Sequence, residues 1–187
     1  MNLVERVKAI LVDPKSEWKT IEGEPGDFSS LFKSYVGIMA AIPPVCTFIG
    51  TALIGYGPFR VGIASGILHA VVGYALTLVG IYVAAYIIDF LAGTFGGQSN
   101  LQNAMRISAY APTAGWLAGV FGIIPMLSIL SLLGLYSLYL LHTGIATLMR
   151  PPAEKALLYT IAVIVVMIVL WVVVGGILFA IFGMGMA

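Results

Sequence analysis

Four ionisable side chains lie within long apolar stretches of the chain: His69, Asp89, Arg106 and His142. Ionisable groups at membrane depth are costly to bury, so they are candidates for a functional site by default. Asp89 and Arg106 flank one short predicted loop, so their side chains could pair. His142 lies eight residues before Arg150, which places it in the half of the membrane nearer to that loop.

Further polar residues recur near these four at helical spacing. Asn103, Arg106, Tyr110 and Thr113 step by three, four and three, which places them on one helix face. Two other stretches carry similar series: Tyr82, Tyr86 and Asp89 in one, and Tyr136, Tyr139, Thr143 and Thr147 in the other. The spacing therefore predicts a polar cluster near the cytoplasmic side, made of Asp89, Asn103, Arg106, Tyr110, Tyr139 and His142.

This predicted cluster has two interpretations. It could form a vestibule or ion path, or it could supply interhelical hydrogen bonds that set the packing, each worth about 0.6 kcal/mol. We favour the packing interpretation, because Asp89 is the only acid within the predicted spans and a proton relay needs a second one.

Motifs for catalysis or metal binding are missing from the sequence. It holds no HExxH, no GxSxG and no paired acids of an intramembrane protease. His69 and His142 fall on different predicted helices, and Cys46 is the single cysteine, so we expect no metal and no cofactor. The net charge of +1 offers no basic field for nucleic acid. We therefore do not expect an enzyme.

The composition indicates that lipid surrounds much of the chain. Of 187 residues, 60% are hydrophobic and only 9% are charged, whereas a soluble domain has about 25% charged residues. A span needs about 20 mostly apolar residues. The sequence predicts an all-α, polytopic membrane bundle with five transmembrane helices, at about residues 31–54, 61–90, 100–122, 126–149 and 157–182. Pro43, Pro44 and Pro112 interrupt two of them, and Thr113 could satisfy a carbonyl that Pro112 frees.

The Lys and Arg residues predict the orientation of these spans. With a cytoplasmic N-terminus and an extracytoplasmic C-terminus, only Arg60 of the nine falls outside. The other eight fall on the cytoplasmic side: Arg6, Lys8, Lys15, Lys19, Lys33, Arg106, Arg150 and Lys155.

Residues 1–30 hold most of the charge and form a cytoplasmic segment before the membrane domain of residues 31–187. Within the segment, Leu3, Val7, Ile10 and Leu11 recur at helical spacing. We predict a short amphipathic helix that stops near Asp13 and Pro14 and lies on the cytoplasmic leaflet, with Trp18 at the interface. The alternative is that this helix packs on the protein's own cytoplasmic parts.

Glycine is abundant, with 22 residues. Three pairs have the GxxxG spacing that lets helix backbones approach closely: Gly62 and Gly66, Gly93 and Gly97, and Gly115 and Gly119. We expect these glycines to pack helices within the chain rather than to drive dimerisation.

The assembled pattern resembles the Yip (Ypt-interacting protein) domain family, in a bacterial branch. The stretches that carry the resemblance are "LVDPKSEWKTI", "FGGQSNLQNAMRISAYAPTAGW" and "LYSLYLLHTGIATLMRPPAEKA". The matching positions are Pro14, Trp18, Gly96, Gly97, Arg106, Tyr110, Pro112, Tyr136, Tyr139, Gly144, Lys155 and Ala156.

The resemblance implies a five-span membrane protein without known catalysis. Eukaryotic relatives are linked to Rab-type GTPases through their N-terminal regions. This chain has a short N-terminal segment without the Asp-Leu-Tyr-Gly-Pro motif, and Ala109, Tyr110 and Pro112 meet the Gly-Tyr-x-x-x-Pro pattern only in part. These departures count against GTPase binding.

We therefore expect a multi-pass inner-membrane protein that organises the membrane or binds partners as a scaffold. The expected partners are the lipid bilayer, and further copies of the chain or other membrane proteins. The alternative is a transporter or channel for a small solute or ion that uses the predicted polar cluster.

Overall fold

The computed structural model describes residues 2–25, 28–55 and 60–183, and these residues form helices joined by short turns, with no strand among them. The N-terminal helices are α1 (Leu3–Val12) and α2 (Pro14–Gly23). The elements that follow are α3 (Phe28–Leu31), η1 (Phe32–Val36), α4 (Gly37–Met39), α5 (Ile42–Phe48), η2 (Ile49–Ile54), α6 (Ile63–Ala92), α7 (Leu101–Tyr110), α8 (Thr113–Ala118), η3 (Gly119–Ile123), η4 (Pro125–Leu135), α9 (Tyr136–Gly144), η5 (Ile145–Met149) and α10 (Ala153–Gly183).

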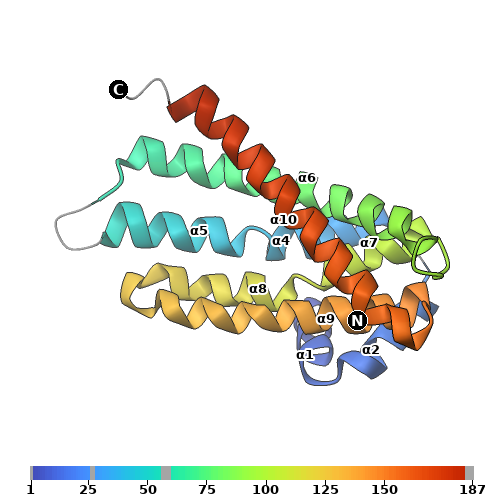
Figure 1. The fold of residues 1–187 in the computed structure, drawn as a ribbon. Coiled ribbons are helices and arrows are strands. Elements are labelled where there is room, and N and C mark those ends of the chain that lie inside the picture. Colours follow the sequence, from blue (N-terminus) through green and yellow to red (C-terminus); the bar gives the residue numbers. More distant parts are fainter. Residues whose placement is uncertain (1, 26–27, 56–59, 184–187) are drawn as a thin grey trace.

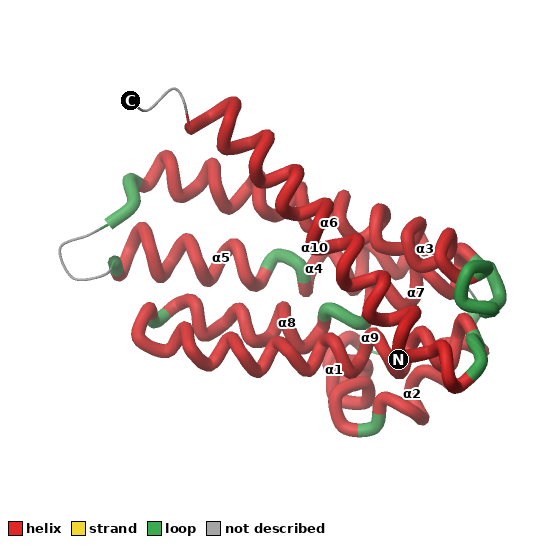
Figure 2. Tube along the Cα trace, in the orientation of Figure 1, coloured by secondary structure: helices red, strands yellow, loops and turns green. Residues whose placement is uncertain are grey.

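Four helical stretches in the described part of the chain are long and apolar enough to cross a membrane: Phe28–Ile54, Ile63–Ala92, Met126–Met149 and Ala153–Val173. They coincide with four of the predicted spans. The first is interrupted by the turn at Ala40 and Ala41 (Figure 2), after which Pro43 and Pro44 sit in the first turn of α5. Proline is tolerated there because the first helical N–H groups have no intrahelical partner.

The predicted span at 100–122 is divided and does not join these four. α7 ends at Tyr110, a turn at Ala111 and Pro112 follows, and α8 is short. Pro112 has no N–H to donate and disfavours helical geometry at the residue before it, which explains the break. The Thr113 hydroxyl donates to the Tyr110 carbonyl at 2.6 Å, which gives a backbone acceptor at the break a side-chain donor.

The N-terminal segment forms two helices that pack on the bundle, and we call α1 and α2 together the N-terminal cap (Figure 1). The break at Asp13 and Pro14 is where the sequence predicted it. Ile10 is fully buried, and Leu3, Val7 and Leu11 pack against the core. The apolar face of α1 is therefore covered by the protein, which favours the packing alternative. Trp18 is fully buried as well, so protein side chains and not lipid surround its ring.

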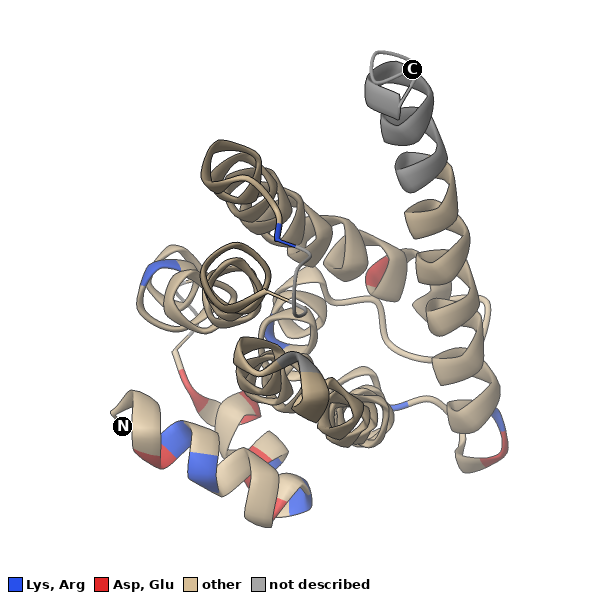
Figure 3. Cartoon of the chain, turned by 90° about the vertical axis from the view of Figure 1, so that its left-hand side faces the viewer, with Lys and Arg blue, Asp and Glu red and all other residues tan. Residues whose placement is uncertain are grey.

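Most of the core lies at the end of the bundle where the cap sits. There the cap residues Ile10, Trp18 and Ile21 join one cluster with residues of α6, α7, α9 and α10. The C-terminal half of α10 contributes mainly exposed apolar side chains among those described, including Val169 and Val172. Figure 3 shows that the charged segments gather on the two helices that follow the N-terminus.

Four of the six glycines predicted to pack helices do so. A Cβ on Gly66 would meet Phe48 at 2.9 Å, one on Gly97 would meet the Met149 carbonyl at 2.9 Å, and one on Gly119 would meet Pro43 at 2.8 Å. A Cβ on Gly115 would lie 3.3 Å from Ser137 Oγ. Gly62 and Gly93 face open space, so their predicted packing role is wrong. The sequence analysis missed Gly144, where a Cβ would lie 2.8 Å from the Trp18 ring.

We predict that Gly144→Ala destabilises the protein by about 1–3 kcal/mol, because the added methyl overpacks a site under a buried aromatic ring. Thermal unfolding in detergent measures the change. Gly80→Ala is the matched control, because nothing lies within 4 Å of its position. There the gain in helix propensity should keep or raise stability. Equal stability of the two variants would contradict the close packing of the Trp18 ring against Gly144.

Candidate functional site

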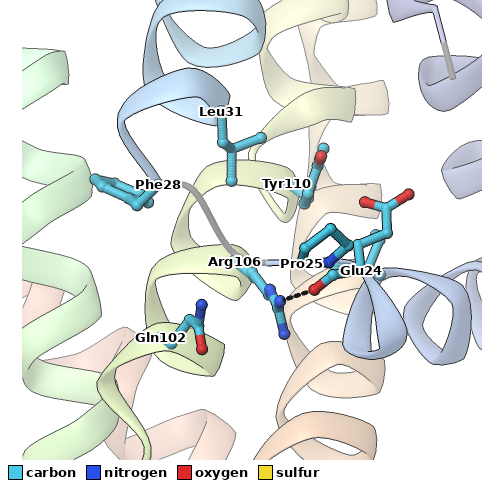
Figure 4. Close-up of a pocket in the computed structure, with 8 residues that line it drawn as sticks. Glu24, Pro25, Phe28, Leu31, Gln102, Arg106 and Tyr110 are labelled. Atoms are coloured by element: carbon cyan, nitrogen blue, oxygen red, sulfur yellow. Dashed lines mark hydrogen bonds between the residues drawn. The ribbon is translucent and has the colours of Figure 1, made fainter.

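Arg106 of α7 is buried and ties the bundle to the end of α2. Its guanidinium donates to the Glu22 carbonyl at 3.1 Å, to the Glu24 carbonyl, and to Asn103 Oδ1 at 3.0 Å. Figure 4 shows the Arg106 side chain directed at Glu24. The last carbonyls of a helix have no intrahelical partner and carry partial negative charge. Arg106 therefore closes the C-terminal end of α2.

Arg6 of α1 forms a second link, within the cap itself. It pairs with the carboxylates of Glu17 and Glu24, and its side chain is only 6% exposed. Its guanidinium carbon lies 5.5 Å from the centre of the Tyr110 ring. Burial lowers the pKa of Arg6, but the hydrogen bond to Glu24 and the negative charges of Glu24 and Glu17 outweigh it, so the pKa lies above its ordinary value.

Arg150 makes the third arginine contact with the cap, and it lies at the surface. Its Nη2 is 2.6 Å from Glu22 Oε1, and the Arg150 side chain is 56% exposed. Arg6 and Arg150 thus pair with carboxylates of α2 and of the residue after it, while Arg106 binds backbone carbonyls there. Exposed ion pairs contribute about 0–1 kcal/mol, so the buried arginines matter more.

Aromatic side chains fill the space beneath the cap. The Tyr110 ring packs edge-on against Trp18, at 6.3 Å between ring centres, and against Tyr35, at 4.6 Å. Trp18 Nε1 donates to Thr143 Oγ1 at 3.0 Å. Tyr35 lies 2.7 Å from Thr113 Oγ1, and it is the donor because the Thr113 proton goes to the Tyr110 carbonyl. These contacts fix the cap to both α7 and α9.

The structure brings together three of the six residues predicted to form the polar cluster. Asn103, Arg106 and Tyr110 lie under the cap, and Asn103 Nδ2 also donates to the Leu148 carbonyl at 3.1 Å. Asp89 does not pair with Arg106. Its Oδ1 accepts from Ser99 Oγ at 2.8 Å, while Arg106 faces α2.

His142 and Tyr139 lie apart from the residues under the cap. His142 Nδ1 is 3.0 Å from Thr160 Oγ1 of α10, and it is the donor because Thr160 donates to the Ala156 carbonyl at 2.9 Å. This is an interhelical hydrogen bond, as the packing interpretation expects. Tyr139 is 42% exposed and its ring lies 5.4 Å from that of Tyr136. The six residues therefore form three separate groups. Asn103, Arg106 and Tyr110 lie under the cap, Asp89 lies beside Ser99, and Tyr139 and His142 lie on α9.

Two cavities adjoin the cap. One has a volume of about 420 Å³ and lies between α1 and the start of the Phe28–Ile54 stretch, with Arg6, Glu24, Ser30 and Tyr35 in its wall. The other, of about 50 Å³, is lined by the residues drawn in Figure 4, among them Arg106. Every buried side-chain nitrogen or oxygen in the described part of the chain has a hydrogen-bond partner. No group of His, Cys, Asp and Glu among the described residues has the arrangement of a metal site.

The predicted polar cluster does not include Arg6, Glu17 and Glu24, which form ion pairs in the cap. The sequence predicts these charges on a segment that lies on the leaflet or packs on the protein's own cytoplasmic parts. One signal was present, because Arg6 lies three residues after Leu3 and four before Ile10, on the apolar face of α1. A charge on a face that is otherwise apolar indicates a buried partner.

Comparisons with known proteins agree with the membrane character. The Yip1 domain family matches residues 8–174. Inner membrane proteins named YohC from two strains of Escherichia coli are each 28% identical to the chain over 127 residues. The match covers 65% of this chain and 65% of the length of each relative. No solved structure matches the chain. None of these similarities points to a catalytic family.

We predict that Arg106→Gln lowers the free energy of unfolding by about 3 kcal/mol, because the buried carbonyls at the end of α2 lose a charged donor. Trypsin should then cleave faster at Lys8, Lys15 and Lys19 of the cap. Arg60→Gln is the control, because Arg60 is exposed and surface changes stay within about 0.5 kcal/mol. Unchanged cleavage in Arg106→Gln would contradict this role.

We predict that His142→Ala lowers thermal stability in detergent by loss of the bond to Thr160. A double-mutant cycle with Thr160→Val should give a coupling energy of about 0.6 kcal/mol. His69→Ala is the control, since the His69 ring contacts the Ser65 carbonyl of its own helix. A coupling of zero would mean that the two side chains do not bond in the membrane.

Proposed function

The chain belongs to the Yip1 domain family, and we propose that it is a multi-pass inner-membrane protein that organises the membrane or holds partners without catalysing a reaction. The four apolar stretches support its embedding in a membrane. The inner-membrane relatives support its location. In this proposal the cap faces the cytoplasm and the C-terminus lies on the other side.

We further propose that the divided segment α7–α8–η3 is a fifth crossing. Its first turns lie at the cap end, where Gln98 N donates to the Met149 carbonyl at 2.7 Å. Its last turns lie at the opposite end of the bundle, where Gly122 packs on Gly50 near the end of the first stretch. A segment that runs from one end to the other beside four membrane helices favours five crossings, and five crossings place the two termini on opposite sides.

The hydrogen bonds from Arg106 to the Glu22 and Glu24 carbonyls are the main support for the scaffold role. A transport path through the cap end needs polar groups that are free to exchange partners. Here Asn103 and Arg106 bond to backbone carbonyls of η5 and of the cap, while Asp89 and His142 bond elsewhere. Such a packed arrangement favours a rigid platform over an ion or solute path.

The outward face of α1 is the part of this platform that we propose meets a partner. Val4 and Val12 are 72% and 76% exposed, and the exposed Lys8 lies between them at a spacing of four. Val4 and Val12 are the exposed large apolar side chains of the cap among the described residues. A further copy of the chain or another membrane protein would cover them.

We predict that photo-crosslinking residues at Val4 and Val12 capture the same protein in native membranes. A probe at Val172 of α10, which is exposed on an apolar helix, is the control and should capture lipid alone. Purified protein in liposomes should conduct no protons, cations or small anions at any pH. Flux that Arg106→Gln abolishes, or the absence of any protein captured through α1, would refute the scaffold role.

A further inference from the structure

The 420 Å³ cavity beside the cap combines charged, hydroxyl and apolar groups at the end of a membrane helix. Its walls include Glu24, Ser30 and Ser34 on the polar side and Leu3 and Leu31 on the apolar side. Ser30 and Ser34 lie in the first two turns of the apolar stretch Phe28–Ile54. The cavity therefore lies where that stretch begins, at the level where lipid headgroups are expected. Small-molecule sites have volumes of about 300–1,000 Å³.

Glu24 and Ser34 leave hydrogen-bond acceptors accessible in this cavity. The Arg6 guanidinium forms ion pairs with Glu17 and Glu24, and the Arg6 side chain is nearly buried. Glu24 uses Oε1 for that pair, and its side chain stays 39% exposed. Ser34 donates its proton to the Ser30 carbonyl at 2.7 Å, so its oxygen is left as an acceptor. A carboxylate with neighbouring hydroxyl oxygens suits a ligand with several N–H donors.

One lysine lies on the same end of this helix, outside the residues that line the cavity. Lys33 is exposed, lies one turn after Ser30, and takes part in none of the ion pairs found among the described residues. A lysine ammonium on its flexible stem binds phosphate as a point charge. The end of the helix thus offers acceptors within the cavity and a phosphate-binding cation beside it.

We propose that this cavity binds the headgroup of a phospholipid that carries a primary ammonium beside its phosphate. The ammonium donates to Glu24 and to the hydroxyl oxygens of Ser30 and Ser34. The phosphate pairs with Lys33, and Leu3 and Leu31 contact the glycerol and the first carbons of the acyl chains. The site needs only a membrane around the Phe28–Ile54 stretch and is independent of the scaffold role.

The proposed chemistry discriminates among lipids. A choline headgroup has the same phosphate and positive charge but no N–H to donate, so it loses the bonds to Glu24 and the serines. A glycerol headgroup keeps the phosphate and has no ammonium, so it offers no charged donor to the Glu24 carboxylate. One charge-assisted hydrogen bond corresponds to roughly a tenfold difference in affinity.

The test uses delipidated full-length protein in detergent, titrated with phosphatidylethanolamine, phosphatidylcholine and phosphatidylglycerol of identical acyl chains. Native mass spectrometry measures binding, and thermal unfolding measures stabilisation. We expect phosphatidylethanolamine to bind about tenfold more tightly than the other two. Equal binding of the three lipids would overturn the proposal. Soluble phosphoethanolamine that stabilises the protein as strongly as the lipid would also overturn it, because the ligand would then not be a lipid.

Variants locate the binding in the cavity. Ser34→Phe fills the space at an exposed position, and Ser30→Ala with Ser34→Ala removes the hydroxyl acceptors without adding volume. Ser34→Phe should abolish the preference for phosphatidylethanolamine, and the double alanine variant should weaken it, because the Glu24 carboxylate remains. Ser16→Ala with Thr20→Ala is the matched control, because these hydroxyls are exposed on α2 away from the cavity. A preference that survives in both cavity variants would overturn the assignment.

Discussion

The burial of the Arg106 guanidinium is the constraint on which the cap end of the bundle depends. A charge removed from water is costly unless hydrogen bonds replace its hydration. Arg106 recovers those bonds from Asn103 beside it and from two carbonyls at the end of α2. The position of α2 is therefore coupled to that of α7. Once α2 is held there, Trp18 reaches Gly144, and Arg6 can meet both Glu17 and Glu24.

The membrane stretches were predictable because a long apolar run has one stable solution in lipid, a helix that satisfies its own backbone. Residues 126–149 were predicted to the residue. The 100–122 segment was predicted as one span with an interruption at Pro112, and the structure divides it there. Its first half contains Asn103 and Arg106 and is too polar for an apolar membrane helix. Both side chains bond to backbone carbonyls at the cap end of the bundle.

The candidate site was predictable only in part, for a physical reason. Helical spacing tells which residues share a face, and it placed Asn103, Arg106 and Tyr110 together correctly. It does not tell which neighbour that face meets. Asp89, Tyr139 and His142 also lie on polar helix faces. Their side chains contact Ser99, Tyr136 and Thr160, respectively, and not the cap. The partners of Arg106 are backbone carbonyls, which no residue type in the sequence reveals.

A distance measurement tests most directly whether the cap is docked on the bundle in a membrane. Spin labels at Thr20→Cys on α2 and Glu154→Cys at the start of α10, in a Cys46→Ser background, report the separation by pulsed electron paramagnetic resonance in nanodiscs. Both label positions are exposed, so the labels do not disturb the packing. The account predicts a single narrow distance distribution. A broad distribution, or a second population at longer distance, would contradict it.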